Sequence, residues 1–354
     1  MVLLAKLGFN IGFALAWIAA VFLVHRRKAH RSWSWPLIAG VLLCGAMMLM
    51  IPLFWSRRFV LMGLLSWGIF LHMPALALTV AVLCWREQRR LAVAASAVAL
   101  ALVSLWAYCF CFEAYNLKVR HYEIRSAKIN SPMRIAVAAD IQTDRPKEYD
   151  VRAMDRMMAE KPDLIVFAGD YIQTRNWSEY EAGTKALNAI LRNTGIAAPL
   201  GAVAVRGNTD HEPLWRANFA NLPIQILDGQ RIELANGVTL DGLSMQDSFS
   251  REIALGASDA FHIVVGHCPN FALSDIAPDL MIAGHTHGGQ VALPGIGPLI
   301  KGSVVPRSWA AGHTKISPDR HLVVSTGIGL ERGHAPRLRF LCPPEIVIID
   351  VLPQ

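Results

Sequence analysis

Four apolar stretches without Lys, Arg, Asp or Glu occupy most of the first 113 residues. They are Gly8 to Val24, Trp35 to Trp55, Phe59 to Trp85 and Leu91 to Phe112. Each reaches or approaches the roughly 20 apolar residues that a helix needs to cross a bilayer, where a helix satisfies its own backbone polar groups. Tryptophans lie near the ends of these stretches, as in the aromatic belts of membrane proteins. We therefore predict four transmembrane helices in residues 1–113, with a cleaved signal peptide as the less favoured alternative for the first stretch.

The formal charge of +7 would by itself favour a nucleic-acid partner, but it is unevenly distributed. Residues 1–113 hold ten Lys or Arg against two acidic residues, whereas the rest of the chain holds 24 basic and 25 acidic residues. The basicity therefore belongs to the loops of the predicted membrane region. We expect a lipid bilayer as a partner, and no nucleic acid.

The basic residues of the short loops also predict an orientation, because cytoplasmic loops carry the excess of Lys and Arg. The first and third loops carry seven of them: Arg26, Arg27, Lys28, Arg31, Arg86, Arg89 and Arg90. This bias predicts an integral protein of the cell (inner) membrane with its C-terminal domain outside the cytoplasm. Four basic residues just past the last stretch favour the opposite orientation: Lys118, Arg120, Arg125 and Lys128.

His72 and Pro74 lie within the third stretch. An ionisable side chain inside a membrane is a hypothesis of function, and a neutral histidine packed between helices is the alternative. The six cysteines form no CxxC pair and no dense framework, so the sequence predicts neither a zinc site nor a set of disulfides.

The pattern changes after a polar connector, residues 114–132, into a domain that spans residues 133–354. Short β-branched runs alternate there with amphipathic segments. The expected helices are Val151 to Glu160 and Tyr180 to Leu191. The expected strands cover residues 134–139, 164–168, 201–205, 224–227, 238–242, 262–265, 280–283, 322–325 and 345–351. Such alternation, with consecutive strands later in the chain, predicts a layered α/β sandwich.

Residues of metal-binding types follow several of these strands. They are Asp140, Asp170 and Asn208 after the first three strands, and His267, His285 and His287 after two later ones. The carboxyl ends of strands are where open α/β sheets bind ligands. Two carboxylates, an amide oxygen and three imidazoles suit two divalent ions such as Mn, Fe or Zn. Such a pair clamps the attacking and leaving oxygens of a phosphoryl displacement and supplies a hydroxide near neutral pH.

The motifs D-x-Q, GD, GN-x-D, GH and GHTHGGQ resemble those of the calcineurin-like metallophosphoesterase superfamily, over roughly residues 133–352. The later LPGIG, STGIG and PPEI segments are similar to its membrane-associated predicted phosphohydrolases. The resemblance implies a four-layer α/β/β/α sandwich and two bound divalent metal ions. It also implies that Asp140, Asp170 and His287 hold the first ion, that Asp170 bridges, and that Asn208, His267 and His285 complete the second site.

Two residues depart from the family pattern. Gln142 stands where the family has a histidine on the first metal, so an amide oxygen becomes the candidate ligand. Thr209 stands where the family has the histidine that steadies the phosphate or protonates the leaving oxygen, and general acid help is worth about 10²–10⁴-fold in rate. His211 and His334 are candidate substitutes, with solvated loop histidines as the alternative. The candidate catalytic residues are thus Asp170, Asn208 and His211, whereas three histidines match nothing and are expected to be structural or solvated: His262, His313 and His321.

The leading hypothesis is a membrane-bound phosphoesterase with a dinuclear metal site. It would cleave a phosphomonoester, phosphodiester or pyrophosphate with a metal-bound hydroxide. Four spans exceed what tethering needs, so a lipid-linked substrate belongs to the hypothesis; the resemblance includes relatives that act on UDP-diacylglucosamine. The alternatives are a catalytically impaired metal- or phosphate-binding membrane sensor or scaffold, and a transporter, which the absence of acidic residues from the spans disfavours.

Overall fold

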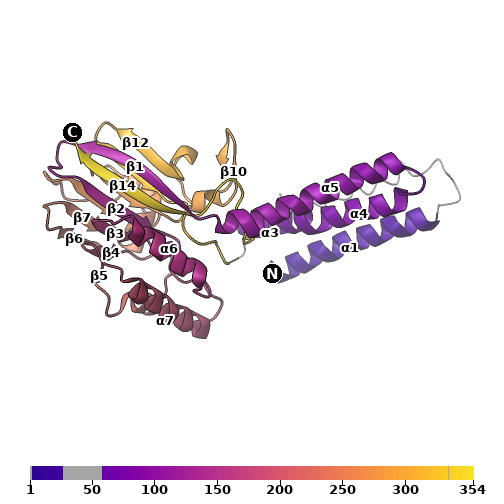
Figure 1. The fold of residues 1–354 in the computed structure, drawn as a ribbon, viewed down its shortest axis with the longest axis horizontal. Helices are drawn as coiled ribbons and strands as arrows, with labels where there is room; N and C mark the ends of the chain where they lie inside the picture. Colours follow the sequence, from indigo (N-terminus) through magenta and orange to yellow (C-terminus); the bar gives the residue numbers. More distant parts are fainter. Residues whose placement is uncertain (1, 27–57, 334) are drawn as a thin grey trace. The chain divides into compact units, whose positions relative to one another are not determined.

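The computed structural model of the protein describes residues 2–26, 58–333 and 335–354 (Figure 1). The chain divides into two compact units. The helical unit comprises Met1–Cys111 with His334–Pro336, and the α/β unit comprises Phe112–Gly333 with Arg337–Gln354.

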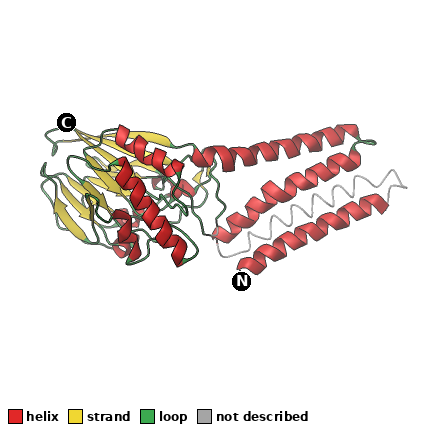
Figure 2. Ribbon diagram, turned by 60° about the horizontal axis from the view of Figure 1, so that its bottom comes forward, coloured by secondary structure: helices red, strands yellow, loops and turns green. Residues whose placement is uncertain are grey.

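The helical unit consists, in its described part, of long apolar helices (Figure 2). They are α1 (Val2–Arg26), α3 (Arg58–Trp67), the π-helical turn η3 (Gly68–His72), α4 (Met73–Cys84), α5 (Arg89–Ala107) and the π-helical turn η4 (Tyr108–Phe112). Two continuous segments, Met62–Cys84 and Arg89–Tyr115, are long and apolar enough to cross a membrane. They coincide with the third and fourth predicted spans. The first predicted span falls on α1, and the second, Trp35 to Trp55, lies outside the described residues, so the prediction of four spans stays a prediction.

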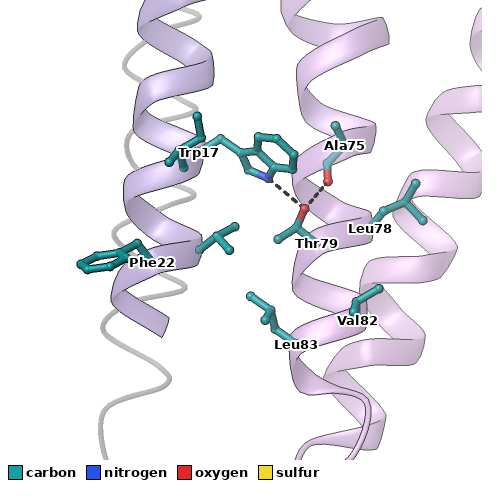
Figure 3. A pocket seen from close by; sticks show the side chains of 9 residues that line it. Trp17, Phe22, Ala75, Leu78, Thr79, Val82 and Leu83 are labelled. Atoms are coloured by element: carbon teal, nitrogen blue, oxygen red, sulfur yellow. Dashed lines mark hydrogen bonds between the residues drawn. The ribbon is translucent and has the colours of Figure 1, made fainter. Parts of the chain in front are cut away.

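Polar side chains connect α1 to the later helices of this unit. Nε2 of His72 lies 2.7 Å from Oδ1 of Asn10, and the His72 ring stacks on Phe13 with the centroids 4.2 Å apart. Farther along, the Trp17 indole donates a hydrogen bond of 2.8 Å to the Thr79 hydroxyl, beside an apolar groove of about 750 Å³ between α1 and α4 (Figure 3). These contacts agree with the interpretation of His72 as a packed, hydrogen-bonded histidine.

Two six-stranded sheets form the α/β unit. The first has the order β1 (Lys118–Ser126), β14 (Glu345–Pro353), β2 (Met133–Ala138), β3 (Leu164–Phe167), β4 (Ala202–Ala204) and β5 (Ile224–Ile226). The second has the order β12 (Gly312–Ser317), β13 (Arg320–Val324), β9 (Leu280–Ala283), β8 (His262–Val265), β7 (Thr239–Gly242) and β6 (Gln230–Glu233). A short hairpin joins β10 (Ala292–Leu293) and β11 (Gly297–Pro298). The strands β2 to β5 run parallel, as do β7, β8, β9 and β13.

The core of the sandwich lies between the two sheets. Alternate residues of β2, such as Ile135 and Val137, pack there with Ile263 and Val265 of β8 and are fully buried. The intervening residues of the same strands are buried too, against the outer layers. Strands covered on both faces need apolar residues at every position, which is why these segments are continuous β-branched runs in the sequence.

The helices α6 (Glu148–Ala159) and α7 (Trp177–Thr194) cover the outer face of the first sheet (Figure 1). Met154 and Met157 of α6 and Leu187 of α7 are fully buried there. The side chain of Asn176 caps the start of α7 by accepting from the Glu179 backbone N–H, which satisfies one of the free N–H groups at a helix start. Both predicted helices are therefore confirmed.

Two features of the unit differ from the sequence prediction. The outer face of the second sheet is covered by loops and short helical segments rather than by a layer of long helices; these segments include α8 (Met245–Phe249), η7 (Pro269–Leu273) and η9 (Arg307–Trp309). In addition, the predicted connector contains β1, which pairs in parallel with β14 along its whole length. This edge strand is mostly exposed and carries several charged residues, so it lacks the apolar run that marks the buried strands in the sequence. Three further 3-10 segments lie in the described part of this unit: η5 (Glu113–Tyr115), η6 (Leu214–Phe219) and η8 (His287–Gly289).

Candidate metal centre

The carboxyl ends of five parallel strands carry the predicted site residues. Asp140, Asp170 and Asn208 follow β2, β3 and β4, which are neighbours in the first sheet. In the second sheet, β8 and β9 are followed by the three histidines of the set: His267, His285 and His287. Because parallel strands end at the same edge of a sheet, the fold itself gathers these side chains.

One cluster forms around Asp170. Asp170, His267 and His285 each offer one ligand atom, and these atoms lie within 4.8 Å of one another. Nε2 of His267 is 3.4 Å from Oδ2 of Asp170 and 3.1 Å from Oδ1 of Asn208, whereas its Nδ1 is 2.9 Å from the Ala168 carbonyl oxygen. A carbonyl only accepts, so Nδ1 carries a proton and Nε2 faces two oxygens. That arrangement needs a cation between the three atoms, either a proton on Nε2 or a metal ion.

Asp140 and His287 form the adjoining part of the centre. Both carboxylate oxygens of Asp140 accept from the His285 backbone N–H at 3.0 Å, and Oδ1 is 3.7 Å from Nε2 of His287. Asp140 is fully buried and His287 nearly so, yet Nδ1 of His287 has no hydrogen-bond partner among the described residues. Because Nε2 is the ring nitrogen that faces Asp140, it is the candidate ligand atom of His287.

Gln142 contributes a free ligand atom. Its Nε2 donates 2.9 Å to Oδ2 of Asp170, and the opposite orientation of the amide would place two oxygens against each other. Oε1 is therefore fixed as a buried acceptor, and no described residue donates to it. An unsatisfied buried acceptor costs about 1–3 kcal/mol, a cost that a bound cation offsets. The oxygens and ring nitrogens of the centre thus fit divalent metal ions.

The backbone of the centre is unusual in carrying ligand-type residues at positive φ. The φ angles are 47° at Asp140, 37° at Gln142, 59° at Asp170, 69° at His285 and 49° at His287. Two glycines permit the close approach of these turns. An added Cβ would lie 2.2 Å from Oδ1 of Asp170 at Gly207 and 2.5 Å from Oδ2 of Asp140 at Gly284. Only glycine fits at either position without displacing a carboxylate.

Asp210 is a buried scaffold residue of the centre whose role the sequence pattern did not reveal. One of its oxygens accepts from the backbone N–H groups of Asp170 and Gly207, each at 2.8 Å, and the other accepts from Tyr171 at 2.9 Å. It therefore fixes the turn on which the Asp170 side chain depends. The motif GN-x-D was the available signal, since a carboxylate two residues after a candidate ligand can bind the turn that carries it.

Arg339 is a second scaffold residue that the sequence did not reveal. It is fully buried, and its guanidinium donates to the backbone carbonyls of Thr326, Gly327 and Gly329 at 2.7, 3.1 and 2.7 Å. This STGIG segment in turn packs on Asp140, whose carbonyl accepts 2.7 Å from the Gly329 N–H. Burial and the charge of Arg339 both lower the pKa of the nearby His287 well below its usual value.

Burial and mutual charge set the protonation of the centre. Burial alone would lower the pKa of His267, but the charge and hydrogen bond of Asp170 outweigh it and raise that pKa to about 9. Burial would raise the pKa of Asp170, yet the His267 charge and hydrogen bond hold it below its usual value. Burial lowers the pKa of His285 to about 4, with the His267 charge adding to the effect, and raises that of Asp140 to about 7. A proton on His267 is therefore the competitor of any metal ion at this position.

The remaining predicted residues lie around the centre or away from it. Thr209 donates its backbone N–H to Oδ1 of Asp170 at 2.8 Å, and its buried hydroxyl has no described partner. The His211 ring packs edge-on against Trp177 and Tyr180, with centroids 5.0 and 5.2 Å away. His334 lies outside the described residues. The three histidines expected to be structural or solvated have protein partners: Asp241 for His262 at 2.6 Å, and His313 and His321 for each other at 2.8 Å.

Comparisons with known proteins agree with this geometry. Residues 133–289 match the calcineurin-like phosphoesterase family. The chain is 32% identical over 212 residues to an uncharacterized metallophosphoesterase, YkuE of Bacillus subtilis, and the alignment covers 54% of this chain and 68% of that protein. It is 25% identical to the phosphodiesterase YaeI of Escherichia coli, covering 63% and 83%. It is 24% identical to the UDP-2,3-diacylglucosamine pyrophosphatase LpxG of Chlamydia muridarum, covering 62% and 84%.

The fold and the comparisons define a metal-dependent phosphoester hydrolase. The chain belongs to the calcineurin-like phosphoesterase family, whose members typically use a pair of divalent metal ions. The resemblance inferred from the D-x-Q, GD, GN-x-D, GH and GHTHGGQ motifs is thereby confirmed.

Proposed function

We propose that the protein is a membrane-bound, dinuclear phosphoesterase that hydrolyses a phosphate ester or pyrophosphate, with a lipid-linked substrate as the favoured class. The observation that carries the proposal is the cluster of Asp170, His267 and His285, whose ligand atoms face one another in a buried site. The membership of the family supports the chemistry, and the two long apolar helices support the membrane location.

The proposed ligands divide between two ions. Asp140, Gln142 and His287 would hold one ion. Asn208, His267 and His285 would hold the other, with Asp170 shared between them. When bound, the pair of divalent ions supplies Lewis acid charge for the phosphoryl oxygens and lowers the pKa of water to near neutrality.

The residues of the chain orient and protect this centre. The Ala168 carbonyl holds the proton of His267 on Nδ1, so that Nε2 points inward, and Gly302 O accepts 3.2 Å from Nε2 of His285, which leaves Nδ1 of that ring free. Burial of Asp140 and Asp170 excludes water and strengthens every charge interaction inside the site. We propose Asn208 as a residue that contacts the phosphate and His211 as the proton donor to the leaving oxygen.

The lipid-linked substrate rests on two supports. Apolar helices would hold the site near lipid head groups at high effective concentration. In addition, the relative LpxG is named for a pyrophosphatase reaction on UDP-2,3-diacylglucosamine. The second candidate function is a metal- or phosphate-binding membrane sensor or scaffold with impaired turnover, which Thr209 in place of a catalytic histidine favours.

The test is hydrolysis of bis-p-nitrophenyl phosphate by the purified, detergent-solubilised protein with added Mn²⁺. The comparison is an Asp170→Ala variant, with Asp155→Ala on the exposed face of α6 as the matched loss of a carboxylate. We expect the wild type and Asp155→Ala to turn over the ester and Asp170→Ala to lose at least about 10³-fold, the scale of losing a central electrostatic group. Equal rates for the wild type and Asp170→Ala would refute the proposal of an enzyme and favour the sensor or scaffold.

The membrane proposal has its own test. A reporter fused after Gln354 that is active only outside the cytoplasm should be active in cells, if the loop charges set the topology. If instead a reporter that works only inside the cytoplasm is active at this position, the proposed orientation is reversed and nucleotide-linked lipids become the favoured substrates. Recovery of the chain in the soluble fraction after carbonate washing would refute the membrane location.

A further inference from the structure

The β10–β11 hairpin and the loop that follows it, residues 292–302, pack directly against the turn that carries two of the proposed ligands. The Gly302 carbonyl oxygen accepts 3.2 Å from Nε2 of His285. On the same turn, a Cβ added to Gly289 would lie 2.9 Å from Cβ of Pro298. These contacts fix the segment beside the metal centre, and Figure 1 shows the hairpin projecting from the sandwich.

Large apolar side chains are exposed on this segment and on the chain paired with it. Ile296 at the tip of the hairpin exposes 55% of its surface, whereas Leu299 and Leu341 each expose 46%. Val291 joins them, because its carbonyl accepts 3.0 Å from the Leu299 N–H and it forms a β-bridge with Phe340, the neighbour of Leu341. We call Ile296, Leu299 and Leu341 the apolar rim. Exposed apolar side chains that gather in this way mark sites of protein or membrane interaction.

The charges around the apolar rim are of one sign. Residues 280–318 contain no Asp or Glu, whereas Lys301, Arg307 and Lys315 are basic. The Arg307 guanidinium donates 2.7 Å to the Pro298 carbonyl, which holds a positive charge at the base of the hairpin. Basic residues beside exposed apolar ones are typical of segments that lie at the surface of an anionic bilayer.

The α/β unit is also tied to the end of a candidate span. The apolar segment Arg89–Tyr115 ends inside this unit, where Glu113 is buried and the Tyr115 ring packs edge-on against Tyr149 with the centroids 5.5 Å apart. Two residues separate the segment from β1, a distance of at most about 11 Å along the chain. A bilayer that surrounds this span would therefore have its surface close to the α/β unit.

The start of β1 is joined in turn to the chain that carries the apolar rim. The Lys118 N–H donates 2.9 Å to the carbonyl of Pro344, which lies three residues after Leu341. A lipid surface is thus the partner that the chain itself brings to this part of the α/β unit, and its anionic head groups match the basic residues.

We propose that the apolar rim enters the head-group region of the bilayer that holds the chain's own helices, so that the α/β unit is itself a membrane-contacting domain. The inference rests on the proposed membrane location and goes beyond it, because it assigns a second contact with the bilayer. On entry, half-exposed aliphatic side chains leave water while basic side chains approach anionic head groups. The metal centre, fixed beside the hairpin, would then lie at the level of the lipid phosphates.

The experiment places a fluorophore on the full-length protein in nanodiscs of phosphatidylethanolamine and phosphatidylglycerol, with one copy in each disc. A bimane label is attached to Ile296→Cys or, separately, to Leu341→Cys. Both carry Cys44→Ser and Cys111→Ser, since Cys111 is exposed and Cys44 lies outside the described residues. Nitroxides on the lipid head groups should quench both labels at least about twofold more than a label at a site in water, because interfacial side chains lie about 5–10 Å into the head-group and acyl boundary.

Two further labels make the outcomes distinguishable. Asp155→Cys, on the exposed face of α6, supplies the site in water, and Leu100→Cys, on the exposed face of α5, should be quenched by nitroxides on the acyl chains. Quenching at Leu100 without quenching at Ile296 and Leu341 would overturn the membrane contact of the rim and leave the proposed membrane location intact. A label at Ile296 that is shielded from aqueous iodide but not quenched by lipid nitroxides would also overturn it, in favour of a protein partner. Absence of quenching at Leu100 would instead count against the membrane location itself.

Discussion

Removal of the Asp210 carboxylate is the most direct test of how the fold holds Asp170. The Asp210→Ala substitution deletes the acceptor of three buried backbone N–H groups, those of Asp170, Tyr171 and Gly207, at 2.8–2.9 Å. Only 1% of Asp210 is exposed, so water cannot replace these hydrogen bonds unless the turn opens. The substitution should therefore act on stability and on the position of Asp170 together.

The size of the effect follows from the number of orphaned donors. Each unsatisfied buried N–H costs about 1–3 kcal/mol, so the loss of three should destabilise the α/β unit by at least about 3 kcal/mol. For a unit of this size, about 1 kcal/mol corresponds to roughly 2–4 °C in Tm, so we expect a drop of about 6–12 °C or more. Asp210→Asn keeps one acceptor oxygen but turns an N–H donor toward another donor, and should fall between Ala and the wild type.

The assay is thermal unfolding of the detergent-solubilised protein by circular dichroism, paired with Mn²⁺ titration calorimetry below the transition. Asp155→Ala serves as the matched control, because an exposed carboxylate contributes about 0.5 kcal/mol or less. We expect Asp210→Ala to lower both Tm and the affinity for Mn²⁺, and Asp155→Ala to change neither. A Tm of Asp210→Ala within about 2 °C of the wild type would show that these hydrogen bonds do not hold the turn.

Three further changes probe the centre and its supports. In chelator-treated protein, the free energy of unfolding should fall as pH rises from 6.5 to about 9, because folding raises the pKa of His267 and its stabilising proton is lost through that range. The His267→Asn variant should show a smaller change of Tm over the same pH range. Arg339→Met should destabilise the α/β unit by about 3 kcal/mol or more in the same assay, since it strands several buried carbonyls, and an unchanged Tm would contradict that role. Gly284→Ala should displace the Asp140 carboxylate and weaken Mn²⁺ binding at least about tenfold in calorimetry, whereas Gly8→Ala, with open space around its Cβ, should not.

The convergence of the site residues was predictable because it follows from topology alone. Asp140, Asp170 and Asn208 each follow a buried apolar run within a few residues, and parallel strands must end at one edge of their sheet. The sequence likewise predicted the helices α6 and α7 from their amphipathic spacing. The local sequence pattern was sufficient to predict these strands and helices, because each of them buries one or both faces against a neighbouring layer of the fold.

The supporting role of Arg339 was not predictable, since its partners are backbone carbonyls that lie well before it in the chain. The guanidinium of Arg339 binds carbonyls 10 to 13 residues earlier, and nothing in an apolar context such as RLRFLC distinguishes this arginine from a surface residue. The strand β1 was hidden for a different reason, because an exposed edge strand needs few apolar residues. Free atoms such as Oε1 of Gln142 become visible only when every neighbouring donor is placed.

The left-handed backbone conformation at the metal centre places the proposed activity in conflict with thermal stability. Side chains other than glycine cost on the order of 1 kcal/mol in this region, and five of the proposed ligands adopt it. At Asp140 and Asp170 the carboxylates accept backbone N–H bonds that offset this cost, whereas Nδ1 of His287 has no partner among the described residues. Selection for thermal stability alone would therefore act first on His287, a residue on which the proposed hydrolysis depends.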